Sequence, residues 1–413
     1  MRGWLCLLLA LPVINSYAET EVDVRLKYFA AAQALPDSDL NRQFGGTPQY
    51  DHNGDVRTLI RHYSGEFTFA LDHTLAFSAG DAFSAVGFGA GAADVGQLVD
   101  NDDRRPLDMT WQLDDGGRHQ LWHRLDRLFV NVQAGNWSAT LGRQAISWGG
   151  GLVFAPLDLF SPFTPTAVDK DYKPGEDALL VERLFADGSD LQLLAVGRRD
   201  EAEEFTGQAA SVGGKYRRAL GNGELELMLG KHYRDQIAGL GWRYPLGGAL
   251  LRTDLLFTDS DDFGSVRVSG LLNLDYSVAW RERTIYLFAE YFHNGFGVRS
   301  LPDSPLELPT ELTDRLRRGE VFTLMRDYLA LGTQIQWHPL WTQSQTLIGN
   351  LQDGSALLQA QLTYEPSDKT RLEFGFVATL GKRDKEFGGI PVLQLSGIQG
   401  PASGRTLYQG GTD

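Results

Sequence analysis

The sequence predicts an all-β chain that is exported and folds as one transmembrane, antiparallel, up-and-down β-barrel of about 16 strands, within a range of about 14 to 18. Three observations support this fold class. The start of the chain has the pattern of a secretory signal, most later segments alternate apolar and polar residues, and no later apolar run reaches the roughly 20 residues of a membrane helix. The predicted organisation is a signal peptide at residues 1–18, a barrel at 19–381 and a last strand or periplasmic tail at 382–413.

The amino-terminal segment has the three parts of a cleavable signal. Arg2 supplies the positive charge, and an apolar run covers residues 5–14. A Ser-Tyr-Ala sequence then ends at Ala18, which places small residues at the cleavage site and two positions before it. We therefore expect cleavage after Ala18. Because Cys6 is removed with this segment, the mature chain has no thiol for a disulfide or a thiolate metal site.

Alternation with a period of two is the main signal in the rest of the chain. In residues 272–280, one face carries Leu272, Leu274, Tyr276, Val278 and Trp280, and the other carries polar or small side chains. Residues 58–88 hold two or three further strands. The other alternating segments are residues 128–134, 137–141, 237–244, 251–258, 329–337, 355–364 and 371–380.

Strand length and aromatic placement favour a membrane barrel over a soluble sandwich. The longer segments have about 9–12 residues, enough to cross a bilayer at a tilt, whereas soluble strands average about 5–6. Trp242, Trp280, Trp337 and Tyr364 fall near strand ends on the apolar face, where an interfacial aromatic girdle belongs. A closed barrel also leaves no unpaired backbone edge in lipid.

Short turns alternate with long polar connections. Asn222-Gly223 is a good tight-hairpin signal, and the other candidate turns are at 187–188, 247–248, 353–354 and 367–368. Longer segments lie at 36–55, 94–107, 200–208 and 298–320, and residues 309–318 are consistent with a short helix on the outer face. This asymmetry matches short periplasmic turns and long outer loops.

Charge and motif content exclude several functions. Loss of Arg2 leaves 37 of the 38 basic residues against 53 acidic ones, a net charge of −16, which argues against a nucleic-acid partner. The eight histidines are scattered, and the chain has no His-Glu-x-x-His pair and no Gly-x-Ser-x-Gly elbow. We therefore predict no enzyme activity, no catalytic or metal-binding residues and no cofactor. An acidic group at Asp100, Asp102, Asp103 and Asp108 fits a solvated loop better than a calcium site.

One long segment carries a recognisable motif. Residues 141–151 read Leu-Gly-Arg-Gln-Ala-Ile-Ser-Trp-Gly-Gly-Gly, and residues 156–162 read Pro-Leu-Asp-Leu-Phe-Ser-Pro. This pattern resembles a motif of porin-like Gram-negative outer-membrane barrels, and residues 169–177, 290–297, 338–340, 350–355 and 386–389 look like its continuation. The resemblance implies a barrel in the outer membrane, in contact with its lipid and lipopolysaccharide and inserted by the barrel assembly machinery, but it implies no substrate. The Gly-Arg-Gln strand end is also distantly similar to barrels that export alginate.

Residues 149–176 are the most informative candidate site. Three glycines open the segment, four prolines stiffen it, and apolar residues at 152–163 can anchor it. The segment either folds into the barrel and narrows the lumen or forms a structured clasp at the rim. In the first case its charged residues lie at the constriction: Asp158, Asp169, Lys170, Asp171 and Lys173.

Further polar residues fall on the lumen-facing phase of the strands. A charge that faces lipid at mid-membrane costs about 2–4 kcal/mol for Arg or Lys, so inward placement is favoured. Such residues either select permeants or pair with one another across a wet interior. They are Arg127, Asn131, Arg243, Arg252, Asp254, Asp275, Glu290 and Glu373.

These features favour an outer-membrane channel for passive or substrate-selective diffusion of small hydrophilic solutes. An export or envelope-assembly barrel with periplasmic partners is the second hypothesis, and a non-conducting barrel enzyme or receptor is the third. The predicted partners are a small-molecule permeant, the outer-membrane lipids and the assembly machinery, with a homo-oligomer left open.

Overall fold

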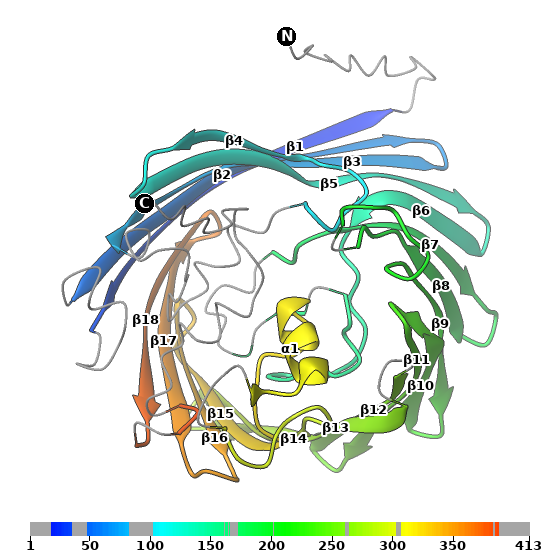
Figure 1. Cartoon of the computed structure of the whole chain (residues 1–413). Coiled ribbons are helices and arrows are strands. Elements are labelled where there is room, and N and C mark those ends of the chain that lie inside the picture. Colours follow the sequence, from blue (N-terminus) through cyan, green and yellow to red (C-terminus); the bar gives the residue numbers. More distant parts are fainter. Residues whose placement is uncertain are drawn as a thin grey trace, which may run out of the picture.

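A computed structural model describes residues 18–34, 48–81, 102–160, 162–163, 165, 172–200, 202–260, 264–302, 307–382 and 385–387. The predicted signal peptide, apart from Ala18, lies outside these residues, as does most of the segment at 382–413. The described chain forms 18 strands in one sheet and one short helix. Figure 1 shows the sheet curled into a barrel around α1 (Thr310–Arg317), so the predicted fold class is confirmed, with 18 strands instead of about 16.

The first nine strands include β6 and β7, whose connection is the first inward segment discussed below. They are β1 (Glu19–Gln33), β2 (Gln49–Ser64), β3 (Phe67–Gly80), β4 (Thr110–Asp115), β5 (His119–Ala134), β6 (Trp137–Gln144), β7 (Glu176–Leu184), β8 (Asp190–Val196) and β9 (Ser211–Leu220). The other nine are β10 (Gly223–His232), β11 (Asp235–Leu246), β12 (Ala249–Ser260), β13 (Ser265–Trp280), β14 (Arg283–His293), β15 (Asp327–His338), β16 (Trp341–Asn350), β17 (Ala356–Ser367) and β18 (Thr370–Leu380). In the region at 58–88, predicted to hold two or three strands, the described residues belong to β2 and β3.

Pairing follows chain order with one exception. Antiparallel ladders join β1 to β2 and β2 to β3, and then each consecutive pair from β5 to β18. β3 pairs with β5, and the short β4 pairs with β5 at Gln120–Arg124, beyond the part of β5 that pairs with β6. The up-and-down order keeps each hairpin local and directs alternate residues of every strand into the lumen.

The two ends of the barrel differ in the length of their connections. Tight turns at one end include Gly221-Asn222 and Gly247-Gly248, where Gly221 and Gly247 have φ angles of 61° and 62° that favour glycine. At the opposite end, β6 and β7 are joined by residues 145–175 and β14 and β15 by residues 294–326. We refer to these as the turn end and the loop end.

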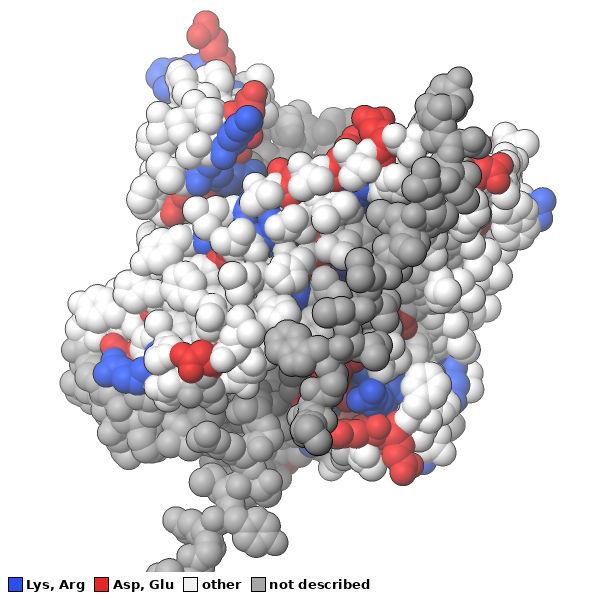
Figure 2. All heavy atoms as spheres, turned by 90° about the horizontal axis from the view of Figure 1, so that it is seen from above, with Lys and Arg blue, Asp and Glu red and all other residues white. Residues whose placement is uncertain are grey.

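The outward face of the wall is apolar and carries aromatic residues at the turn end. Trp280 is 49% exposed at the last position of β13, and Trp137, Trp242 and Trp337 are exposed near the same end. Trp341 and Tyr364 stack with a ring-centroid distance of 4.3 Å. In the view of Figure 2 the wall surface is mostly uncharged, with charged side chains in separate small groups. This distribution suits a lipid-facing wall with an interfacial girdle.

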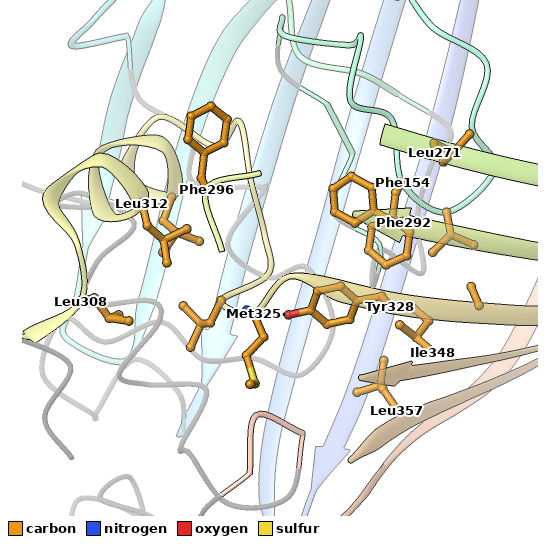
Figure 3. Packing of buried hydrophobic residues seen from close by; sticks show 14 residues of the cluster. Phe154, Leu271, Phe292, Phe296, Leu308, Leu312, Met325, Tyr328, Ile348 and Leu357 are labelled. Atoms are coloured by element: carbon orange, nitrogen blue, oxygen red, sulfur yellow. Dashed lines mark hydrogen bonds between the residues drawn. The ribbon is translucent and has the colours of Figure 1, made fainter. Parts of the chain in front are cut away.

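The helix predicted at 309–318 is confirmed, but it does not lie on the outer face. α1 packs inside the barrel, where Leu312 and Leu316 join a buried apolar cluster with Phe296, Met325 and Tyr328 (Figures 1 and 3). Burial of one apolar side of this helix against the wall is the physical reason for its inward position. No helix of the described ranges is long and apolar enough to cross a membrane.

Single-cysteine labelling tests the inward and outward phases of the strands. We expect cysteines at Leu274 and Phe374, which point outward, to resist a water-soluble thiol reagent in membranes, because lipid covers them. Cysteines at Gln359 and Glu373, on the opposite face of β17 and β18, should react. Cleavage after Ala18 would remove the native thiol and leave no background signal. Preferential labelling of the first pair would show that the phase is reversed.

Candidate functional site

The segment that follows β6 lies inside the barrel and is held there by a wall carboxylate. Glu290, on β14, is fully buried, and its two carboxylate oxygens accept hydrogen bonds from three consecutive backbone N–H groups. The donor–acceptor distances are 2.8 Å for Leu152, 3.0 Å for Val153 and 2.7 Å for Phe154. Asn273 of β13 donates a further hydrogen bond at 3.1 Å. This arrangement satisfies a stretch of backbone that has no strand partner.

Three more wall residues continue the attachment along the inner surface. The Gly150 N–H donates to Asp254 Oδ2 of β12 at 2.8 Å, and the Gly149 N–H approaches Glu226 Oε1 of β10 at 3.4 Å. The Trp148 indole N–H donates to Gln192 Oε1 of β8 at 2.9 Å. The segment is therefore fixed in turn to β8, β10, β12 and β14.

The glycine run makes this close approach possible. Gly149 has a φ angle of 87°, in the left-handed region that L side chains rarely adopt. A Cβ atom at Gly151 would lie 1.7 Å from the carbonyl oxygen of Phe154. The motif glycines thus allow the tight turn that presents consecutive N–H groups to Glu290.

Aromatic side chains anchor the segment on its apolar side. Phe154 stacks on Phe292 of β14 with a ring-centroid distance of 4.5 Å and an interplanar angle of 11° (Figure 3). Phe160 contacts Trp148 edge to face at 5.3 Å, and both belong to a second buried cluster with wall residues of β7, β8 and β10–β12. These contacts bury apolar area that a segment extended into water would leave exposed.

Two of the five charged residues predicted in this segment form a buried ion pair. Lys173 Nζ lies 2.6 Å from Asp158 Oδ2 and also donates to the Ser147 hydroxyl at 3.0 Å. Burial raises the pKa of the Asp158 carboxyl to about 6, and the Lys173 ammonium opposes that rise. Lys173 therefore ties the last part of the segment to its middle at Asp158 and to Ser147 just before its start. The other three residues, Asp169, Lys170 and Asp171, lie outside the described residues.

A cluster of arginines occupies the lumen face of β2, β3 and β5. We call it the arginine cluster; it consists of Arg57, Arg61, Arg124 and Arg127 with the acidic partners Asp72 and Asp126. These four cations share the lumen face with four buried carboxylates, Asp72, Asp126 and, on β2, Asp51 and Asp55, so the formal charges of the face balance. The side chains of Arg57 and Arg61 are 14% and 26% exposed, so both retain contact with solvent.

Tyr172 connects the inward segment to the arginine cluster. Its hydroxyl donates to Asp72, and its ring lies under the guanidinium of Arg57 at 3.7 Å from the ring centroid. The guanidinium of Arg127 lies 4.7 Å from the centroid of the same ring, and Arg127 donates to the Lys173 carbonyl oxygen. The carboxy-terminal part of the inward segment is thus attached to β2, β3 and β5, on the side of the barrel opposite Glu290.

The remaining predicted lumen residues form pairs along the wall. Arg252 of β12 is paired with Asp275 of β13, and Arg243 of β11 lies 2.9 Å from Glu224 of β10. Asn131 donates to the hydroxyl groups of Ser138 and Thr140, its neighbours on β6. Glu373 lies 3.9 Å from Arg371 on β18. The structure brings Arg243, Asp254 and Glu290 together at the inward segment, while Asn131 and Glu373 stand apart from it.

One buried charge network was not predicted from the sequence. Arg143, 1% exposed, lies 2.8 Å from both Asp102 Oδ1 and Asp177 Oδ1. Asp102 also accepts from the Met109 N–H at 2.7 Å and pairs with Arg105. Burial disfavours the ionised Asp102 carboxyl, but Arg105 and Arg143 outweigh it and hold its pKa below the ordinary value. The prediction of a solvated acidic loop is therefore wrong for Asp102. Asp100 lies outside the described residues.

Solved structures of outer-membrane porins are similar to this chain. A BenF-like porin from Pseudomonas fluorescens Pf-5 matches with a TM-score of 0.51 and 10% identity over 88% of this chain and 93% of that chain. Pseudomonas aeruginosa OpdK, solved with vanillate, matches at 0.49 and 12% over 88% and 93%, and Acinetobacter baumannii OccAB4 at 0.49 and 9% over 88% and 92%. No protein-family model and no curated protein sequence matches. At 10% identity the BenF-like porin supports the overall fold alone, which is a membrane-type β-barrel.

Proposed function

We propose that this chain is an outer-membrane channel for passive, substrate-selective diffusion of small hydrophilic solutes. The observation that carries the proposal is the inward segment at 149–176, which Glu290, Asp254 and Tyr172 fix between opposite parts of the inner wall. A barrel wall needs no such segment for its own backbone pairing. A fixed segment inside the lumen narrows the aqueous path and places polar groups along it.

The arginine cluster supports a preference for anions. On the lumen face of β2, β3 and β5, Arg57 and Arg61 keep part of their surface in contact with water, whereas the carboxylates of this face are buried. A fixed positive charge beside a narrow aqueous path raises the local concentration of anions, and salt weakens this effect. The described part of the path therefore favours small anionic solutes over cations of the same size.

The motif at residues 141–162 builds the inward segment itself, through Gly149, Gly151 and Asp158. We propose that the motif marks barrels with a segment of this kind; the distant similarity to alginate-export barrels adds no separate function. The proposed setting is the outer membrane with its lipids and lipopolysaccharide, reached through the barrel assembly machinery. Transport by diffusion needs no catalytic step and no cofactor.

Neutralising two arginines tests the anion preference. We expect Arg57→Gln combined with Arg61→Gln to lower the chloride-over-potassium permeability ratio by about two- to fivefold, since loss of two partly solvated charges changes ion transfer by about 0.5–1 kcal/mol. Reversal potentials in planar bilayers measure the ratio, and the change should be larger at 0.05 M than at about 1 M salt. Arg283→Gln is the control, because Arg283 lies at the turn end, with its guanidinium 4.8 Å from the centroid of the Trp337 ring. An unchanged permeability ratio in the double variant would show that the arginine cluster does not line the ion path.

The same recordings separate this proposal from its alternatives. A channel gives stable single-channel steps with the purified chain alone. A barrel enzyme or receptor with a plugged lumen gives none. An export or envelope-assembly barrel is indicated if steps appear only after a periplasmic partner is added or removed.

A further inference from the structure

The ladders of the described strands leave the barrel wall open along one line, which we call the seam. β1 has a ladder with β2 alone and β18 has a ladder with β17 alone, so among the described strands neither has a partner on its second side. Both faces of β1 and of β18 are exposed along most of their length, whereas strands such as β11 bury alternate residues. An open sheet edge is excluded in lipid, so a barrel in a membrane needs a partner for both strands at the seam.

Strand direction excludes an antiparallel pair between β1 and β18. β4 covers only a short part of β5 at the loop end, so 17 of the 18 strands span the wall. The ladders of these strands are antiparallel, and with an odd number the first and the last run in the same direction. Both β1 and β18 run from the turn end to the loop end. One further strand that runs back to the turn end would pair antiparallel with both, and would give the even number typical of bacterial barrels.

The chain that follows β18 starts at the correct end of the seam. The Leu324 N–H donates to Glu386 Oε1 at 2.7 Å, and the Phe387 N–H donates to Ser355 Oγ at 3.1 Å, beside the start of β17. The chain after Phe387 therefore begins at the loop end. A strand in the seam lies two strand spacings from β17, about 10 Å, and roughly three extended residues cover that distance.

The sequence after Phe387 contains a segment of the required length. Residues 388–413 lie outside the described residues, and within them residues 391–399 read Pro-Val-Leu-Gln-Leu-Ser-Gly-Ile-Gln. A transmembrane strand needs about 9–11 residues, and proline is tolerated at the first position of a strand. A Gly-Gly pair at 388–389 and a Gly-Pro pair at 400–401 flank the segment as turn signals.

We propose that residues 391–399 form the strand that closes the barrel, antiparallel to both β18 and β1. In this placement Leu393 and Leu395 face lipid, and Gln394 and Ser396 face the lumen, because alternate residues of a strand point to opposite faces. The strand joins the two edges that the ladders leave open and keeps lipid out of the lumen. The proposal goes beyond the channel function and does not rest on it.

Single cysteines at four consecutive positions test the placement in the full-length protein in membranes. We expect cysteines that replace Gln394 and Ser396 to react with a water-soluble thiol reagent, and cysteines that replace Leu393 and Leu395 to be protected by lipid. A cysteine at Phe374 is the protected reference, since that residue faces outward on β18. Equal reaction at all four positions would overturn the proposal, because a tail in water or a plug in the lumen has no lipid-covered face.

Disulfide cross-links identify the neighbours of the segment. One cysteine is placed at an outward position of β1 or β18, and the second is moved through residues 392–398. The outward positions are Val22, Val24, Leu26, Leu372, Phe374 and Phe376. We expect cross-links from both strands to the segment and none directly between β1 and β18, which an intervening strand holds about 10 Å apart. Moving the β18 cysteine from Phe376 to Leu372 should move its best partner toward residue 398, as antiparallel pairing requires.

The competing arrangements give different cross-links. A direct cross-link between β1 and β18 would show that the two strands pair in parallel without a further strand. A covalent dimer on gels would assign the seam to a second copy of the chain. Either result would overturn the proposal. The cross-links need no conductance, so they are independent of the bilayer recordings that test the channel function.

A matched pair of substitutions tests the phase of the strand. Leu395→Arg places a charge toward lipid and should lower the fraction of refolded protein that migrates as a heat-resistant barrel. Gln394→Arg adds the same side chain one position earlier, toward the lumen, and should leave that fraction unchanged. Equal heat-resistant fractions in the two variants would overturn the assignment of residues 391–399 to the wall.

Discussion

Deletion of residues 153–166 raises the single-channel conductance of the barrel by roughly twofold or more, because it removes the part of the inward segment that fills the lumen beside β12–β14. The wall should survive the deletion, since the ladders of the described strands involve no residue of this segment. Single-channel steps in planar bilayers measure the effect, and heat-resistant migration on gels reports whether the barrel is intact.

Glu290→Ala provides a smaller perturbation of the same structure. It leaves the N–H groups of Leu152, Val153 and Phe154 without their acceptor but keeps every residue of the segment. We expect a noisier open current with a conductance between those of the wild-type and the deleted barrel. Glu373→Ala is the matched control, because Glu373 lies on β18 away from the segment. If the deleted barrel folds and conducts as before, residues 149–176 form a rim element and the constriction assignment fails.

Strand periodicity predicted most of the wall because lipid and water impose opposite demands on the two faces of each strand. The segment at 272–280 illustrates this: Leu272, Leu274 and Tyr276 face outward, and Asn273 faces inward to Glu290. Periodicity could not give the number of strands, because a strand as short as β4, with six residues, has too few alternations to be recognised. The helix at Thr310–Arg317 was predicted as an element, but its inward position depends on packing against distant strands.

The candidate site was predictable in part. Alternation placed Asp254 and Glu290 on the lumen phase, and composition singled out the segment that they hold. Their partners are backbone N–H groups of that segment, and no side-chain pattern reveals such contacts. The arginine cluster was missed except for Arg127, because its members come from three strands that only the barrel brings together. The pairing of Arg143 was not predictable from the sequence, since its acidic partners are 34 and 41 residues away.

Arg143→Met should lower the free energy of unfolding by about 3–5 kcal/mol, the cost of removing one partner from a buried ion pair. Arg143 is 1% exposed, and its loss leaves the buried Asp177 without this cation and leaves Asp102 with Arg105 alone. The guanidinium also donates to the Leu107 carbonyl oxygen, so the same change frees the connection between β3 and β5. Urea unfolding of the refolded barrel in lipid vesicles, followed by tryptophan fluorescence, measures the difference.

Arg217→Met is the matched control for this measurement, because Arg217 also pairs with an aspartate on a neighbouring strand, Asp190 at 2.6 Å, but is 46% exposed. Its loss should cost no more than about 1 kcal/mol, as for other solvated ion pairs. Adding Asp177→Asn to the Arg143→Met barrel should recover part of the loss, since the uncompensated charge beside Leu107 is then removed. An equal loss in the free energy of unfolding for the two arginine variants would show that the Arg143 network is no more stabilising than a surface ion pair. In that case backbone contacts would hold the connection between β3 and β5.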